Sequence, residues 1–228
     1  DRSPWADSAP GVGPAAALVV GAALATVARD TFRAGPAAFW TGRLEEVVWG
    51  GGHLLQFGHT VLMLGAWLVL LGAAGLRPPA SRRALRRLVV LAGLPALLAP
   101  AGWLLGGPGD PEYRAFFTQL MRWGIWPAAA ILAWGMLRRL RRDGGGESGS
   151  GPWPVVVGYS MALFLGGLVA GAFIRADNLL VTAHYHGTVG AVTLAFMGLA
   201  QLLLHRWGVP VAPAGSRIQA HWYGLSIA

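Results

Sequence analysis

Six long stretches of the chain are almost entirely apolar, and they alternate with short segments that hold most of the charged residues. Each stretch has about the 20 residues that an α-helix needs to cross a bilayer, or more. The apolar residues run continuously and do not alternate with polar ones, which argues against β-strands. The pattern therefore predicts six transmembrane helices, at residues 12–31, 47–75, 85–106, 114–137, 154–174 and 179–204.

These elements predict an all-α fold, a polytopic transmembrane helix bundle that forms a single domain over residues 1–228. A seventh helix is expected to begin near Arg217. Pro95, Pro100 and Pro127 lie inside predicted spans and predict kinks there. The chain begins without Met and ends inside the last apolar run, so we expect either a processed chain or a longer parent protein.

Composition supports a membrane protein and removes several kinds of chemistry. Only 12% of the residues are charged and 54% are hydrophobic, whereas soluble domains carry roughly 25% charged residues. The chain has no cysteine. Disulfides, thiolate metal sites and iron–sulfur clusters are therefore excluded.

The net charge of +8 is best explained by membrane orientation and not by nucleic-acid binding. All 18 basic residues are arginine, and 12 of them precede the first span or follow the second, fourth and sixth. Loops rich in basic residues stay on the cytoplasmic side. We therefore expect a multi-pass protein of the bacterial inner (cytoplasmic) membrane, with its N-terminus in the cytoplasm. The 12 residues are Arg2, Arg77, Arg82, Arg83, Arg86, Arg87, Arg138, Arg139, Arg141, Arg142, Arg206 and Arg217.

Three histidines are expected at one depth in the membrane. His53 lies near the start of the second span, and His184 and His186 lie near the start of the sixth. Both spans enter from the periplasmic side, so all three residues lie about 8–11 Å below that end of their helices. His59 lies about 9 Å deeper. Ionisable groups inside a membrane are rare and usually functional. The alternative is that these histidines are hydrogen-bonded packing residues.

The spacing of His184 and His186 suggests two ligand sites. Residues two apart on a helix are about 200° apart around its axis, so one metal ion cannot be chelated by both. Two separate prosthetic groups beside the helix are possible. Gly187 and Gly190 are expected to leave room for a flat macrocycle, and imidazole is the usual ligand of a buried haem iron.

The segment from His184 to Gly198, which begins His-Tyr-His-Gly-Thr-Val-Gly-Ala-Val, resembles the tenth helix of the haem–copper oxidase and nitric oxide reductase catalytic subunit. The resemblance implies that His184 ligates the high-spin haem and His186 the low-spin haem. The stretch from Trp49 to Phe57 resembles the sixth helix of that family, where His53 takes the place of a ligand of the second metal. In a weaker competing alignment, His59 takes this place instead of His53. The chain would then cover the fifth to eleventh helices of the family fold.

Two departures from the family pattern indicate that the second metal centre is incomplete. The span corresponding to the seventh helix, 85–106, lacks the adjacent histidine pair of the family and contains no histidine. Phe57 stands where some oxidases have a redox tyrosine and nitric oxide reductases a glutamate. One imidazole cannot hold copper or non-haem iron against water, so copper is not expected.

The charged residues add one candidate contact and exclude one function. Arg122 is the one charge that we place well inside a span, at the depth of the histidines, and we expect it to pair with a haem propionate. The alternative is that it extends to the membrane interface. The acidic residues fall in loops, termini or span edges, and the chain has no lysine. We therefore do not expect a proton pump.

These observations predict a haem-binding membrane subunit of a respiratory electron-transfer complex, with one or two haems, most simply of b type. His53 could turn onto the iron opposite His184 and give a bis-histidine haem. The expected partners are other membrane subunits and either a c-type cytochrome or quinol. One alternative is an active terminal oxidase or nitric oxide reductase, and another is a haem-free scaffold. Whether the chain is itself an oxidoreductase stays open.

Overall fold

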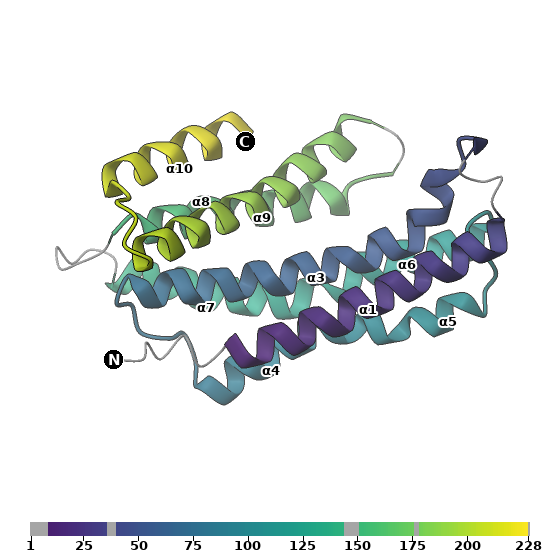
Figure 1. The fold of residues 1–228 in the computed structure, drawn as a ribbon, viewed down its shortest axis with the longest axis horizontal. Coiled ribbons are helices and arrows are strands. Elements are labelled where there is room, and N and C mark those ends of the chain that lie inside the picture. The colour runs from purple at the N-terminus through teal and green to yellow at the C-terminus, as the bar shows by residue number, and fades with distance from the viewer. Residues whose placement is uncertain (1–8, 36–39, 144–150, 176–177, 228) are drawn as a thin grey trace. The chain divides into compact units, whose positions relative to one another are not determined.

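The structure is a computed structural model that describes residues 9–35, 40–143, 151–175 and 178–227. These residues form helices and contain no strand, which confirms the predicted all-α class (Figure 1). In chain order the helices are α1 (Ala9–Ala34), α3 (Leu44–Ala73), α4 (Arg82–Gly93), the 3₁₀-helix η2 (Leu94–Leu98), α5 (Ala99–Trp103), α6 (Pro111–Gly124), α7 (Trp126–Asp143), α8 (Trp153–Ala172), α9 (Leu179–Arg206) and α10 (Pro213–Ile227).

Six helical segments of the described chain are long and apolar enough to cross a membrane, and each overlaps one predicted span. The sequence prediction of a polytopic transmembrane helix bundle is therefore confirmed, and the span ends differ from the prediction by only a few residues. The segments are Gly11–Ala34, Leu44–Ala73, Arg82–Trp103, Pro111–Arg142, Trp153–Ala172 and Leu179–Arg206.

Proline interrupts the third and fourth spans, as predicted. In the third, Pro95 lies in the 3₁₀-helix η2 and Pro100 at the start of α5. In the fourth, the helix breaks at Ile125, two residues before Pro127. Proline has no N–H to donate and its ring crowds the preceding turn, so the backbone ladder is lost at these points.

The expected seventh helix is α10, which begins at Pro213 and not near Arg217. Proline is common at the first position of a helix because its fixed φ angle suits the first turn and its missing N–H would be unbonded there anyway. The prediction rests on the apolar residues after Arg217 and therefore places the start of the helix too late.

The contacts divide the described chain into two compact units. We call Pro10–Leu62 with Arg87–Ala129 the α1 unit, and Met63–Arg86 with Ala130–Ala228 the α9 unit. The single-domain prediction is not tested by this division. His53 and His59 belong to the α1 unit, whereas His184 and His186 belong to the α9 unit.

In the α9 unit, α8, α9 and α10 pack against one another (Figure 1). A buried polar relay links three of its segments. Trp67 donates from Nε1 to the Ser160 hydroxyl at 2.8 Å, and Ser160 donates to the carbonyl oxygen of Ala191 at 2.7 Å. Each of these buried donors thus has an acceptor, which is what a water-free helix interface requires.

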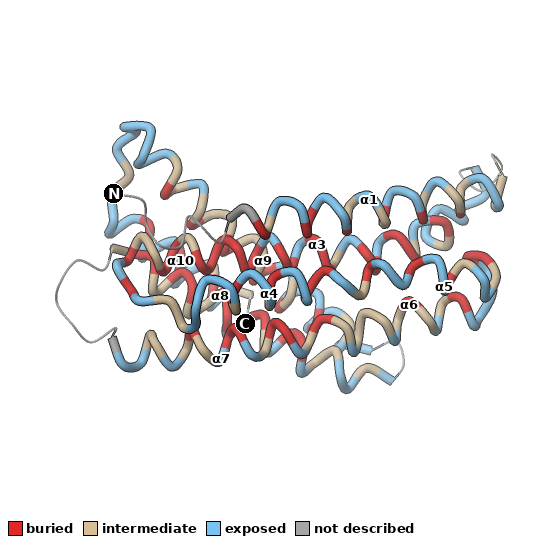
Figure 2. The backbone as a smooth tube through the Cα atoms, turned by 90° about the horizontal axis from the view of Figure 1, so that it is seen from below, coloured by how far each residue is buried: buried red, intermediate tan, exposed pale blue. Residues whose placement is uncertain are grey.

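In the α1 unit, α1 buries one narrow stripe, and the rest of its surface is intermediate or exposed (Figure 2). The stripe repeats every three or four residues, the period of a helix face. Leu18 and Leu24 on the other faces are exposed, as expected of apolar side chains that face lipid. The stripe includes Ala15, Ala16, Val19, Ala23, Thr26 and Asp30, which are all buried.

Candidate functional site

Glycines bring α8 and α9 into close contact beside His184. A Cβ atom added to Gly187 would lie 2.7 Å from the Cα of Gly167 and 2.8 Å from the carbonyl oxygen of Leu163. Small residues at such positions let helix backbones approach closely in a membrane. The side chain of His184, one turn before Gly187 on α9, therefore reaches the backbone of α8.

His184 is buried and its ring orientation is fixed by α8. Its Nδ1 lies 2.8 Å from the carbonyl oxygen of Gly167. A carbonyl oxygen can only accept, so Nδ1 carries the proton and Nε2 of the neutral ring keeps its lone pair. No described residue forms a hydrogen bond with Nε2. A backbone carbonyl on one ring nitrogen is the usual support for an imidazole whose other nitrogen binds a metal.

Gly171 makes room for this ring. A Cβ atom at this position would lie 2.6 Å from Nδ1 of His184, closer than real Cβ contacts. The next glycine along α8 that faces open space is Gly166, where an added Cβ would meet nothing within 4 Å. The position of the His184 ring therefore depends on the glycine at 171.

His186 lies on the other side of α9 and is exposed. The prediction that His184 and His186 face opposite sides of their helix is confirmed by this difference in burial. The expected room for a macrocycle beside Gly187 and Gly190 is wrong. Gly187 meets α8, and a Cβ at Gly190 would lie 2.8 Å from Ile227 of α10, so both glycines serve helix packing.

His53 is the buried histidine of the α1 unit. Its Nδ1 lies 2.7 Å from the carbonyl oxygen of Trp49, one turn earlier on α3, so Nδ1 again carries the proton. The His53 and Trp49 rings lie in contact, with their centroids 4.6 Å apart. His59, six residues later on α3, is exposed. A shared iron between His53 and His184 stays a prediction.

Arg122 lies in the last turn of α6 and is partly buried. Arg29 of α1 is another partly buried arginine of a span, and its guanidinium is bonded to Asp30 and to the carbonyl oxygens of Trp103 and Gly106. The pairing of Arg122 with a propionate stays a prediction.

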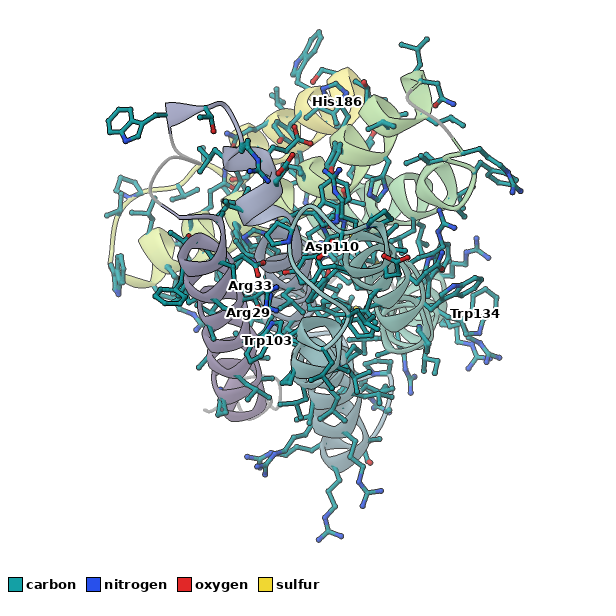
Figure 3. The ribbon with its side chains drawn as sticks, turned by 90° about the vertical axis from the view of Figure 1, so that its right-hand side faces the viewer. Arg29, Arg33, Trp103, Asp110, Trp134 and His186 are labelled. Atoms are coloured by element: carbon teal, nitrogen blue, oxygen red, sulfur yellow. The ribbon has the colours of Figure 1, made fainter. Side chains whose placement is uncertain are left out.

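A polar cluster in the α1 unit, centred on Asp30, is the main feature that sequence reasoning missed. Asp30 is fully buried. Its Oδ1 accepts from Nη1 of Arg29 at 2.6 Å, and its Oδ2 accepts a short hydrogen bond from the Tyr113 hydroxyl of α6. The same arginine donates through Nη2 to the carbonyl oxygens of Trp103, at 2.8 Å, and Gly106, at 2.6 Å. Figure 3 shows Arg29 and Trp103 close together.

Two glycines of α3 admit this cluster. A Cβ atom added to Gly50 would collide with the Tyr113 hydroxyl, and one added to Gly51 would lie 2.8 Å from the carbonyl oxygen of Ala23 in α1. The run of glycines before His53 therefore lets α1 and the Tyr113 side chain approach α3.

The period of α1 could have revealed the burial of Asp30. Its buried residues follow one another at intervals of three or four, and Asp30 lies four residues after Thr26 on the same face. Hydropathy alone placed Asp30 only at a span edge. A charged residue on the packed face needs a partner, and Arg29 and Tyr113 are the partners of Asp30.

A second group in the α1 unit joins Arg114 of α6 to Trp49 of α3. The Cζ of Arg114 lies 4.3 Å from the centre of the Trp49 ring, within cation–π distance. Arg114 Nε and Trp49 Nε1 are both buried, and neither has a hydrogen-bond partner among the described residues.

Among the described residues, no three side chains of His, Cys, Asp or Glu gather closely enough to hold a metal ion together. The buried imidazoles of His53 and His184 are the candidate donors for a prosthetic group. His184 fits the role of a haem ligand in its proton position and in the support of its ring, although the neighbouring glycines are occupied by other helices.

Comparison with known proteins adds one relative. The chain is 26% identical over 183 residues to "Uncharacterized protein RP382" of Rickettsia prowazekii (strain Madrid E). The match covers 68% of this chain and 35% of the relative, so the chain corresponds to about a third of that protein's length. No family model and no solved structure matches the chain.

Proposed function

We propose that this chain is a haem-binding membrane subunit of a respiratory electron-transfer complex, with His184 as its buried axial ligand. The observation that carries the proposal is the hydrogen bond from His184 Nδ1 to the Gly167 carbonyl oxygen, which leaves Nε2 as the basic nitrogen. The similarity of the His184–Gly198 segment to the haem-ligating helix of haem–copper oxidases supports the same assignment.

In this proposal α9 carries the haem ligand His184, and α8 holds its ring in place. The Gly167 carbonyl fixes the tautomer and the ring orientation of His184, and Gly171 admits the ring. A haem bound there supplies reversible one-electron chemistry.

The other candidate residues have separate proposed roles. His186 would serve a second haem on the exposed side of α9, whose opposite ligand would come from residues outside this chain. His53, with its proton also on Nδ1, is a further candidate haem ligand. Arg122 would pair with a propionate. His59 is the weaker alternative to His53 as a ligand.

Electron transfer is a better proposal than oxygen or nitric oxide reduction. The absence of histidine from 85–106 removes the pair that would complete a second metal centre in the related family, and copper is not part of the proposal. The arginine distribution supports a bacterial inner-membrane location with a cytoplasmic N-terminus. The electron partner is then a c-type cytochrome or quinol.

The deciding experiment is an optical spectrum of the purified chain in detergent after haem loading. A six-coordinate b-type spectrum in the reduced-minus-oxidised difference, unchanged by carbon monoxide, supports the electron carrier. A carbon monoxide shift with copper or non-haem iron in elemental analysis would indicate a terminal reductase instead. The absence of a Soret band would leave a haem-free scaffold.

Single variants test the ligands in the same assay. His184→Ala is expected to remove the haem with the buried ligand, and His186→Ala to remove only a second haem. His205→Ala is the matched control, because His205 is an exposed histidine at the far end of the same helix. Full haem retention in His184→Ala would contradict the assignment.

A further inference from the structure

Two buried hydrogen-bond donors of the α1 unit lack an acceptor, and they belong to residues in direct contact. Arg114 Nε and Trp49 Nε1 are both shielded from solvent, and neither forms a hydrogen bond with any described residue. Most buried polar groups have a partner, and one without a partner costs free energy. Two such donors in one place indicate a missing acceptor.

Among the residues that the structure describes, the guanidinium of Arg114 also has no counter-charge. It stacks on the Trp49 ring at 4.3 Å, but the described part of the chain contains no carboxylate paired with it. Arg29 of the same unit differs, since it is paired with Asp30 and bonded to two carbonyl oxygens. Charged residues in membrane-spanning helices normally have a partner, and Arg114 lies within one.

The chemistry of the two side chains specifies what is missing. Arginine and the tryptophan indole donate hydrogen bonds and accept none, so the ligand atom must be an acceptor. The unpaired positive charge selects an anionic oxygen, and guanidinium binds carboxylate and phosphate well. The two donor atoms are buried, but each residue as a whole is only partly buried. A ligand can therefore reach the pair from outside the unit.

We propose that Arg114 and Trp49 form a binding site for the anionic oxygen of an amphipathic ligand, a carboxylate or a phosphate group. The location near the end of a membrane-spanning helix suits a ligand whose charged group lies at the membrane interface and whose apolar part lies in the membrane. Two sources carry this chemistry. One is the headgroup of an anionic phospholipid, and the other is a carboxylate of a bound prosthetic group, which rests on the proposed function.

The site also lies next to His53, a candidate haem ligand. Trp49 contacts Arg114 through one cation–π pair and His53 through a ring contact at 4.6 Å, and its carbonyl oxygen accepts from His53 Nδ1. An anion held by Arg114 therefore lies next to the residue that positions His53.

The test uses two variants and a matched control pair. Arg114→Gln removes the charge, and Trp49→Phe keeps an aromatic ring, although a smaller one, and removes the N–H donor. Arg138 and Trp134 form another cation–π pair, at 5.9 Å, in which Trp134 is exposed and no buried donor lacks a partner. Arg138→Gln and Trp134→Phe are therefore the controls. Circular dichroism and size-exclusion profiles show whether each variant folds; if Arg114→Gln does not, Trp49→Phe decides.

The first arm measures lipid binding to the haem-free full chain by native mass spectrometry and by thermal unfolding with added lipid. Phosphatidylglycerol is the anionic probe and phosphatidylcholine the neutral one. We expect phosphatidylglycerol to bind selectively, and Arg114→Gln to weaken it about tenfold or more, since charge-assisted hydrogen bonds are the strong ones. Trp49→Phe is expected to weaken it about threefold or more, and the controls to bind as the unmodified chain does.

The second arm measures the haem midpoint potential of the loaded chain. If the carboxylate of the prosthetic group is the ligand, Arg114→Gln lowers the potential while phosphatidylglycerol binding is the same in all variants. A chain that binds no haem would contradict the proposed function, and the lipid arm alone would then decide the site. Unchanged lipid binding in both variants, without a shift in potential, would overturn the site.

Discussion

Tyr113 donates a hydrogen bond to Asp30 and so joins α6 to α1 across 83 residues of sequence. The carboxylate is fully buried and is held on its other oxygen by Arg29. A buried ion pair depends on having its charges and hydrogen bonds all satisfied, because a lone charge in a low-dielectric interior is costly. The α1 unit thus depends on this pair more than on any exposed salt bridge.

Breaking the cluster is therefore expected to destabilise the protein strongly. Asp30→Asn leaves the charge of Arg29 without a counter-ion and should lower the free energy of unfolding by about 3–5 kcal/mol, the range for losing one partner of a buried pair. Tyr113→Phe removes one bond to a charged acceptor and should cost about 1.5–3 kcal/mol. Denaturant titration in detergent measures both. Tyr185→Phe is the control, because Tyr185 is 48% exposed. Equal stability of Tyr113→Phe and the unmodified chain would contradict the role of the bond.

The glycine at 171 should be needed for the His184 ring. Gly171→Ala places a methyl group against Nδ1 of His184, so either the ring or the helix must move. Forcing an extra carbon into a packed interface costs about 1–3 kcal/mol, and the displaced ring should lose its bond to Gly167 and its ability to hold haem. Haem content and thermal unfolding measure the two effects.

Gly166→Ala provides the comparison on the same helix. Its added methyl group meets open space, and replacing glycine by alanine inside a helix stabilises by about 0.5–1 kcal/mol. The haem content should stay unchanged. If Gly166→Ala and Gly171→Ala behave alike, the close contact at 171 does not control the ring.

The relay through Ser160 should contribute to the stability of the α9 unit. Ser160→Ala removes the acceptor of Trp67 Nε1 and the donor to the Ala191 carbonyl at once. A buried group left without its partner costs about 1–3 kcal/mol, so the unfolding midpoint should fall measurably. Ser226→Ala, at an exposed serine of α10, should leave the midpoint unchanged. A Ser160→Ala midpoint as high as that of the control would argue against the relay.

A propionate partner for Arg122 predicts an electrochemical effect. Reduction lowers the positive charge on the iron, so a nearby cation favours the reduced haem, and Arg122→Leu should lower the midpoint potential. A unit charge about 8 Å away is worth about 2 kcal/mol at an effective dielectric constant of about 20. Redox titration of the loaded chain measures the shift, and Arg138→Leu serves as the control. An unchanged potential in Arg122→Leu would exclude the pairing.

The transmembrane helices were predictable because membrane-spanning length and continuous apolar composition are strong signals. The breaks at Pro95, Pro100 and Pro127 followed from the missing N–H of proline. The fold class and the spans therefore needed no tertiary information. The start of α10 was missed because its first turn is not apolar enough to stand out.

Residue burial within a span was harder to predict. Hydropathy does not distinguish the packed face from the lipid face, so it could not show that His53 is buried and His59 exposed. The same limit hid Asp30, whose partners lie on α6 and in the α1 sequence itself. The sequence predicts open space beside Gly187 and Gly190. That space is filled by residues of α8 and α10, which are distant in sequence and so could not be foreseen.

The absence of a side chain at Gly50 has a consequence for how this sequence can change over evolutionary time. Any side chain at residue 50 would collide with the Tyr113 hydroxyl, and Tyr113 cannot lose that hydroxyl without leaving Asp30 short of a donor. Substitutions at the three positions are therefore coupled. Descendants of this sequence should keep all three residues together or exchange them as a set.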